Sequence, residues 1–152
     1  MMKVIVGCDH RGLELKAAAK GLLQELNIPF EDFGACAGEA VDYPDIAGKV
    51  GRAVVGNPDA RGLLFCGTGL GMAMAANKIP GVRAAAVCDM RTAILSRRHN
   101  DANVLALGEI TVTPAASREI IRIWLETPFE GGRHQRRLDK IMQLEQESKE
   151  YA

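Results

Sequence analysis

A cysteine followed by a glycine-rich turn is the stretch of this 152-residue chain with the most chemical potential. Residues 65–78 read FCGTGLGMAMAANK, so Cys66 stands where an apolar run gives way to a loop. The loop can direct several backbone N–H groups at one small anionic group, and the same surroundings stabilise a thiolate. Cys66 is therefore a candidate base or nucleophile, although a cysteine at a strand end is also an ordinary core residue.

Two further pairs of polar residues have the types that proton transfer requires. Asp9 and His10 end the first apolar run, and His99 and Asn100 close a helical stretch before the last apolar run. Histidine is the side chain best suited to moving a proton near neutral pH. The pair Asp9 and His10 is equally consistent with a simple hydrogen-bonded turn. Because the histidines form no HxH, HxxxH or HxxE grouping, we expect no metal site.

Basic residues gather in the stretch EGGRHQRRLDK. Arg133, Arg137 and Lys140 lie three and four residues apart, which places them on one face of a helix. Guanidinium groups suit phosphate, although such a face is more commonly only solvated charge. Lys plus Arg equals Asp plus Glu at 19 each, so a nucleic acid or an acidic membrane surface is not the expected partner. Any anion site must then be local.

The elements that position these residues follow from the alternation of short apolar runs with amphipathic stretches. The runs predict strands at residues 3–7, 30–34, 62–66, 82–88 and 103–108. The stretches predict helices at residues 13–26, 43–55, 72–78, 90–99, 114–126 and 133–151. This order predicts one α/β domain over residues 1–152: a three-layer Rossmann-like fold with a five-stranded parallel sheet and an extra C-terminal helix. Ligands of such sheets bind beyond the carboxyl ends of the strands, where Asp9 and Cys66 stand.

The cellular compartment is predicted from the N-terminus and the cysteines. The sequence MMKVIVGCDH reaches an aspartate and a histidine too early for a signal peptide, and no apolar run approaches the ~20 residues of a membrane span. The four cysteines form no CxxC pair. We therefore expect a cytoplasmic protein with reduced thiols and no membrane partner.

A dinucleotide-binding loop is the competing interpretation of the glycines. Gly67 and Gly69 follow a strand and precede a helix, and Asp89 ends the next strand 22 residues after Gly67, as the fingerprint requires. The third small position of the fingerprint is nevertheless Met72, and the strand is not the first of the chain. A non-enzymatic nucleotide-binding module is the less favoured alternative.

Five ordered motifs carry a family resemblance: GCDHRG, DYPD, CGTGLGMAMAANK, HNDANVLALG and EGGRHQRR. From residue 3 to about 145 the chain resembles the ribose-5-phosphate isomerase B family, which also includes galactose-6-phosphate isomerase subunits. The resemblance implies an aldose–ketose isomerase that needs neither metal nor nucleotide. It also implies a homodimer or a dimer of dimers with shared active sites. Ribose 5-phosphate is the expected substrate, and a four- or six-carbon sugar phosphate of the tetrulose, allose or galactose type is the alternative.

The resemblance also assigns roles to residues at matching positions. Cys66 would be the base that takes the proton from C2 and returns it at C1, and Asp9 would hold sugar hydroxyls or shuttle a proton. His99 would open the furanose ring, with Asn100 binding the sugar beside it from the partner subunit. The remaining implied contacts line the site, hold the enediolate oxygens or bind the phosphate: Tyr43; Gly67, Thr68, Gly69, Leu70 and Gly71; His10, Arg133 and Arg137.

At two positions of the site, members of the family differ from one another, and this chain can be compared with them. Some relatives use a glutamate further along the loop as base, whereas this chain has Ala75 around that position and keeps Cys66. Many relatives carry a phosphate-binding arginine two residues after LALG, whereas this chain has Ile110. Either a neighbouring basic residue takes over this contact or the substrate has another length.

The closing helix predicts how the chain assembles. Its apolar residues form only a narrow stripe: Leu138, Ile141, Met142 and Leu144. A sheet already flanked by helices offers this stripe no cover, so we expect the helix to dock on a partner subunit across a two-fold axis.

Overall fold

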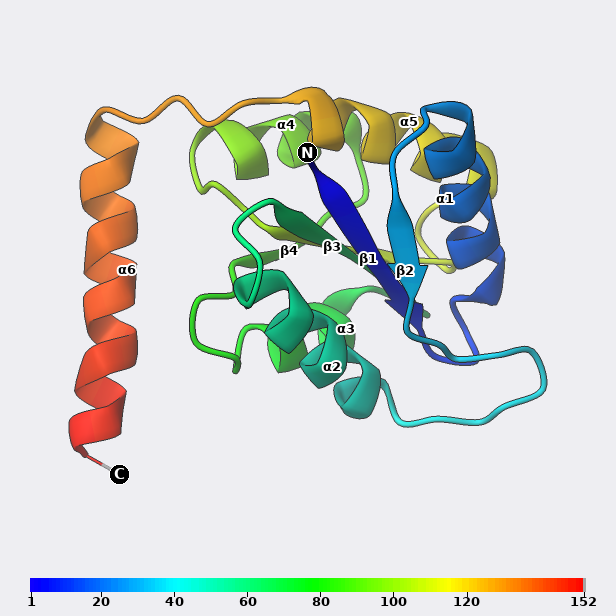
Figure 1. Ribbon diagram of the computed structural model, residues 1–152, viewed down its shortest axis with the longest axis horizontal. Coiled ribbons are helices and arrows are strands. Elements are labelled where there is room, and N and C mark those ends of the chain that lie inside the picture. The colour runs from blue at the N-terminus through cyan, green and yellow to red at the C-terminus, as the bar shows by residue number, and fades with distance from the viewer. Residues whose placement is uncertain (152) are drawn as a thin grey trace.

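Five strands form one parallel sheet in the order β2-β1-β3-β5-β4 in the computed structural model, which describes residues 1–151 (Figure 1). The strands are β1 (Lys3–Cys8), β2 (Phe30–Asp32), β3 (Ala60–Cys66), β4 (Ala84–Ala86) and β5 (Val104–Gly108). The three central strands are buried over nearly all their residues, because helices cover both of their faces. The predicted five-stranded parallel sheet is confirmed.

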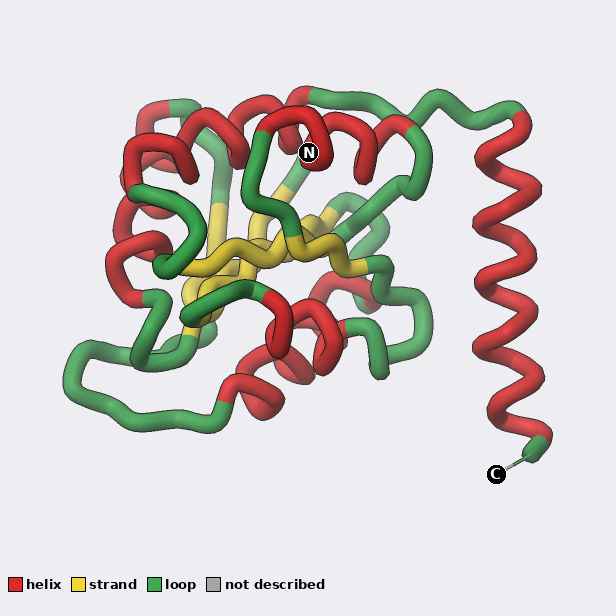
Figure 2. The backbone as a smooth tube through the Cα atoms, turned by 180° about the vertical axis from the view of Figure 1, so that it is seen from behind, coloured by secondary structure: helices red, strands yellow, loops and turns green. Residues whose placement is uncertain are grey.

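Helices flank the sheet on both faces (Figure 2). One layer contains α1 (Leu13–Glu25), α4 (Met90–Arg98) and α5 (Pro114–Glu126). The other contains α2 (Tyr43–Val55) and α3 (Leu70–Ala76). The last helix, α6 (Arg133–Glu150), follows α5 in the chain and stands apart from both layers. Pro44 and Pro114 stand in the first turns of α2 and α5, where a missing N–H costs little. The predicted three-layer α/β fold with an additional C-terminal helix is confirmed.

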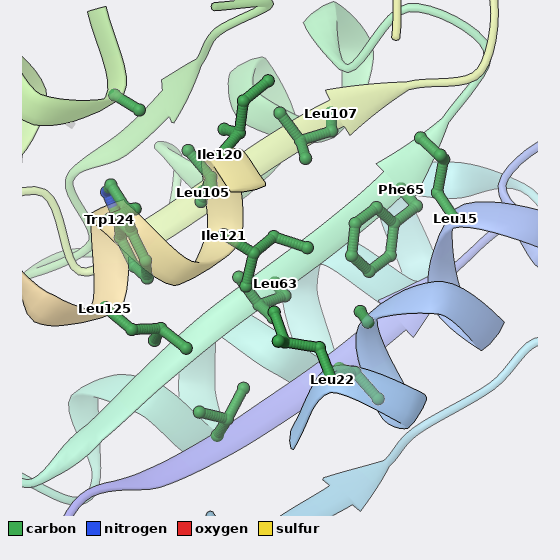
Figure 3. Close-up of a cluster of buried hydrophobic side chains, with 14 of the residues drawn as sticks. Leu15, Leu22, Leu63, Phe65, Leu105, Leu107, Ile120, Ile121, Trp124 and Leu125 are labelled. Carbon is green, nitrogen blue, oxygen red and sulfur yellow. The ribbon is translucent and has the colours of Figure 1, made fainter. Parts of the chain in front are cut away.

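The larger core lies between the sheet and the layer of α1, α4 and α5 (Figure 3). Phe65 and Leu63 of β3 pack there against Leu22 of α1 and Ile121 of α5. Trp124 is fully buried, and its indole N–H donates to the Ser96 hydroxyl at 3.2 Å. Burial of an aromatic ring with its N–H satisfied contributes to stability without the cost of an unpaired polar group.

Both edge strands are shorter than their apolar runs predicted. Residues 30–34 and 82–88 were expected to be strands, whereas β2 and β4 contain three residues each. An edge strand pairs on one side only, and Gly34 leaves the sheet with a φ of 101°. The first residues of the run 82–88 are not part of β4. The Arg83 N–H donates to the Asn103 side chain at 2.7 Å instead of to a neighbouring strand.

The closing helix α6 stands beside the rest of the chain, joined to α5 by residues 127–132 (Figures 1 and 2). Its contact with the body includes a hydrogen bond from the Gly81 N–H to the Glu145 carboxylate at 3.3 Å. A cavity of 650 Å³ separates its lower turns from residues 77–85. Of the predicted apolar stripe, Leu138 is buried, whereas Ile141 and Leu144 are 44% and 64% exposed. Most of the stripe is therefore uncovered within this chain.

Among residues 1–151, no helix combines the length and the apolar character that crossing a bilayer requires.

Candidate active site

Cys66 is the last residue of β3 and lies at the carboxyl end of the sheet. The strand register sets Phe65 opposite Cys8 and Cys66 opposite Gly108, so the ends of β1, β3 and β5 meet. Asp9 follows β1 directly, and its backbone N–H donates to the Phe65 carbonyl at 3.1 Å. Both Cys66 and Asp9 are buried, and both line the same cavity at the carboxyl edge of the sheet.

The glycine-rich loop wraps around the sulfur of Cys66. The Gly69 N–H donates to the Cys66 Sγ at 3.1 Å, and Gly69 adopts a φ of 82° that favours glycine. A hydrogen bond received by sulfur stabilises negative charge there. The Thr68 hydroxyl accepts from the Leu70 N–H at 3.2 Å, so its own proton remains available to a ligand.

Close packing on the end of β5 fixes this loop. The Glu109 N–H donates to the Cys66 carbonyl at 3.1 Å, and the Ile110 N–H donates to the Gly67 carbonyl at 2.9 Å. Gly108 allows the approach, since a Cβ at this position would overlap the Thr68 backbone. Glycine is thus needed at position 108 because a side chain would clash with the loop, and not because the backbone there has a positive φ.

Replacing Gly108 with alanine is expected to destabilise the protein by about 3 kcal/mol or more, because backbone atoms cannot yield as side chains do. Chemical denaturation of the variant measures this loss. Gly38→Ala is a control of mild effect, because no atom lies within 4 Å of its Cβ position, although its φ of 80° adds strain. A Gly108→Ala protein as stable as the wild type would contradict this packing.

The strand ends and the loop enclose one cavity of 430 Å³. Five of the predicted site residues with side chains line it: Asp9, His10, Tyr43, Cys66 and Thr68. Tyr43 begins α2 and packs on Gly71, where a Cβ would lie 2.7 Å from the phenol ring. The Asp9 carboxylate accepts from the Arg11 N–H at 2.9 Å, which orients it beside the thiol. A small molecule in this cavity would meet a base, an acid and several backbone donors.

Gly67 and Gly71 of the loop also line the cavity, whereas four other predicted residues lie elsewhere in the chain. His99 is the C-cap of α4, and α4 runs back from the carboxyl end of the sheet toward the amino ends of the strands. Asn100 borders the cavity beside α6, and Arg133 and Arg137 belong to the first turns of α6. Within one chain, therefore, the structure does not bring these four residues to the Cys66 cavity.

A stacked pair of imidazoles joins α4 to α6. The rings of His99 and His134 lie 4.2 Å apart between centroids with an interplanar angle of 11°. Glu130 approaches the His134 Nε2 to 3.4 Å, and this buried nitrogen has no hydrogen-bond partner among the described residues. Burial lowers the pKa of His134, and the charges of His99, Arg133 and Arg137 lower it further, against the opposing effect of Glu130.

The lowered pKa of His134 predicts a pH dependence of stability. An unfolded histidine titrates near pH ~6.5, whereas His134 in the folded chain takes up its proton at lower pH. The unfolded state then binds more protons below about pH 6.5, so the contribution of His134 to stability is lost as the pH falls. The unfolding temperature is expected to drop from about pH 7.5 to 5.5 more steeply in the wild type than in His134→Gln. Equal slopes in calorimetry would assign the pH effect to other groups.

The same cluster offers ligand types that bind metals. One donor atom each of His99, Glu130 and His134 lies within 4.8 Å of the others. An imidazole binds a metal ion in the plane of its ring, and two nearly parallel stacked rings cannot point at the same ion. In this arrangement the three side chains form an electrostatic cluster, and coordination would require one ring to turn.

Several residues of the two sites were not predicted: Arg11 borders the Cys66 cavity, and Glu130 and His134 surround His99. Ile110 also borders the cavity, at the position where many relatives carry a phosphate-binding arginine. Arg11 and His134 belong to the motifs GCDHRG and EGGRHQRR, and this membership was the sequence feature that could have indicated them as site residues. Their neighbours in space could not be read from motif membership alone.

The dinucleotide alternative loses support at its discriminating residue. The Asp89 carboxylate accepts from the Thr92 N–H at 2.7 Å and from the Thr92 hydroxyl at 2.8 Å, so it caps α4. These hydrogen bonds lower the pKa of Asp89. Met72, in the third position of the fingerprint, is a large side chain buried in the core, whereas the fingerprint requires a small residue there so that helix and strand pack closely.

A parallel sheet with a buried thiol, a carboxyl group and a glycine-rich loop around one cavity at its carboxyl edge is the arrangement of an α/β enzyme that acts on a small molecule. Comparison identifies the family: the Ribose/Galactose Isomerase family matches residues 4–141, and the chain belongs to it. The resemblance predicted from the five motifs is confirmed.

Individual relatives match over nearly their whole length. A putative sugar phosphate isomerase of Bacillus subtilis is 45% identical and covers 97% of this chain and 99% of its own. Ribose-5-phosphate isomerase B of Escherichia coli is 42% identical, and the match covers 96% of this chain and 98% of the relative. A D-erythrulose-4-phosphate isomerase of Pectobacterium atrosepticum is 36% identical, with 98% and 99% covered.

Solved structures agree with the fold. Ribose-5-phosphate isomerase B of Clostridium thermocellum superposes with a TM-score of 0.93 at 44% identity, covering 99% of this chain and 100% of its own. The enzyme of Mycoplasma genitalium with bound ribulose 5-phosphate gives a TM-score of 0.92 at 42% identity, with 96% and 97% covered.

Proposed function

We propose that this chain interconverts ribose 5-phosphate and ribulose 5-phosphate through a cis-enediolate, with Cys66 as the base. The observation that carries the proposal is the buried Cys66 sulfur, which accepts the Gly69 N–H and borders a cavity shared with Asp9. The names of the relatives support the substrate class. The reaction is an intramolecular oxidation and reduction, which needs neither metal nor nucleotide.

The chemistry follows from the position of each group. The Cys66 thiolate takes the C2 proton of the open-chain aldose, and the electron pair forms the C1–C2 double bond while charge develops on O1. The backbone donors of residues 67–71 and the Thr68 hydroxyl stabilise that charge. Asp9 transfers the O2 proton to O1, and the Cys66 thiol returns its proton to C1, which leaves the ketose. A thiol base requires a reduced cysteine, and all four cysteines are free.

The complete site is formed by two copies of the chain. His99 and Asn100 open and hold the sugar ring, and Arg133 and Arg137 bind the phosphate, all from the partner subunit. Their position away from the Cys66 cavity of their own chain supports this arrangement. The uncovered apolar stripe of α6 supports it as well. Residues 1–152 then act as one isomerase domain, at least as a homodimer.

A four-carbon sugar phosphate is the second candidate substrate. Ile110 leaves one rim of the cavity apolar, and the relative from Pectobacterium atrosepticum is named for erythrulose 4-phosphate. A shorter substrate would place its phosphate nearer the loop.

A panel of four-, five- and six-carbon sugar phosphates tests the substrate. The highest kcat/KM is expected for ribose 5-phosphate, because relatives named for this substrate match the chain over nearly their whole length. A preference for the four-carbon compound would move the assignment to the second candidate. NAD, titrated by calorimetry, serves as the control for the nucleotide-binding alternative and is expected not to bind.

A further inference from the structure

Arg11 borders the Cys66 cavity with no role in the mechanism above. Its side chain is exposed, and its guanidinium makes no hydrogen bond or ion pair within residues 1–151. Among the described residues that line this cavity, it is the one with a permanent positive charge, and the lining also includes the carboxylates of Asp9 and Asp42. A free guanidinium offers a fork of donors that matches a phosphate group.

The root of the Arg11 side chain is fixed while its end is free. The Arg11 N–H donates to the Asp9 carboxylate at 2.9 Å, and the Gly12 N–H donates to the Asp9 carbonyl at 3.2 Å. Gly12 is pressed against the Phe65 carbonyl, where a Cβ would overlap. The turn that carries Arg11 is therefore held against the end of β3, next to Cys66.

The Arg11 side chain passes close to Gly67 of the glycine-rich loop. The Arg11 Cδ lies 3.6 Å from the position that a Cβ on Gly67 would occupy, and the Ile110 Cδ1 lies 3.5 Å from it. Arg11 and Ile110 thus flank Gly67 at the mouth of the cavity. Ile110 has no donor to offer, so Arg11 alone of these two can bind an anion there.

We propose that Arg11 binds the phosphate monoester of the substrate, from the same chain that supplies Cys66. This inference rests on the proposed function, since it concerns the same cavity. Cys66 is buried at the base of the cavity and Arg11 is exposed at its mouth, so a sugar with C1 and C2 at the sulfur extends its phosphate toward Arg11. The loop amides near the sulfur serve the enediolate, which leaves the guanidinium for the distal charge.

Arg11→Met removes the charge and keeps the length of the side chain. We expect its KM for ribose 5-phosphate to rise about tenfold or more, with kcat within about threefold, because a charge-assisted hydrogen bond is lost in ground and transition state alike. Competitive inhibition by inorganic phosphate should weaken by a similar factor. The KM of Arg11→Lys should lie between the values of the wild type and of Arg11→Met. Arg52→Met, which replaces an exposed arginine of α2 outside the described cavities, should match the wild type.

Calorimetric titration with inorganic phosphate reads the site without turnover. A fall in phosphate affinity in Arg11→Met supports the proposal even if the wild type does not convert ribose 5-phosphate, and in that case only the substrate assignment fails. Equal phosphate affinity in the wild type and Arg11→Met, with equal KM values, overturns it. Because Arg11 is exposed and unpaired, the variant should retain the wild-type unfolding temperature.

Discussion

Cys66→Ala is expected to lose isomerase activity by a factor of about 10³ or more, since a positioned base contributes roughly 10² to 10⁴ and the nearest other acid, Asp9, has its own task. Substrate affinity should stay within about threefold, because the backbone donors of residues 67–71 remain in place. Exchange of the C2 proton with deuterated solvent, followed by NMR, measures the base directly. Calorimetry measures affinity.

Two companion variants sharpen this result. Cys66→Ser should be nearly as inactive, because a hydroxyl is far less acidic than a thiol. Cys88→Ala removes an exposed free thiol and should retain full activity. Substantial isomerisation by Cys66→Ala would assign the base to another residue and would leave the sulfur a packing role.

Activity recovered by mixing two inactive variants is the second large effect. Cys66→Ala and His99→Ala are each expected to be inactive on the cyclic sugar. In a mixed dimer with shared sites, one site combines both substitutions and the other combines an intact Cys66 with an intact His99. Random pairing makes about half of the dimers mixed, so coexpression at equal levels should restore about a quarter of wild-type activity.

The matched control pairs Cys66→Ala with the double variant that lacks both residues, and it should remain inactive in every dimer. No recovery in the first mixture would mean that each site forms within one chain. That result would require α4 and α6 to move relative to the sheet, because His99 and Cys66 belong to different ends of it.

Much of the fold was predictable because its signals are local. The alternation of apolar runs and amphipathic stretches predicted every strand and helix, and the strand-end rule predicted that Asp9 and Cys66 meet. The lengths of β2 and β4 were overestimated, since pairing on one side only is a property of the assembled sheet.

The surroundings of His99 were not predictable by the same means. The stacking on His134 and the approach of Glu130 depend on where the 127–132 segment delivers α6, which no periodicity encodes. The environment of Arg11 depends on the turn against Phe65. Pairing between chain segments far apart in sequence is decided by packing rather than by local preference.

The single tryptophan has a practical consequence. Trp124 is fully buried, and its ring centroid lies 5.5 and 5.8 Å from the guanidinium carbons of Arg61 and Arg97. The chain thus has one tryptophan, whose emission can be excited apart from that of the two tyrosines, and it reports on the layer of α1, α4 and α5. An emission transition independent of protein concentration would show this layer melting by itself, whereas a midpoint that rises with concentration would show folding coupled to association.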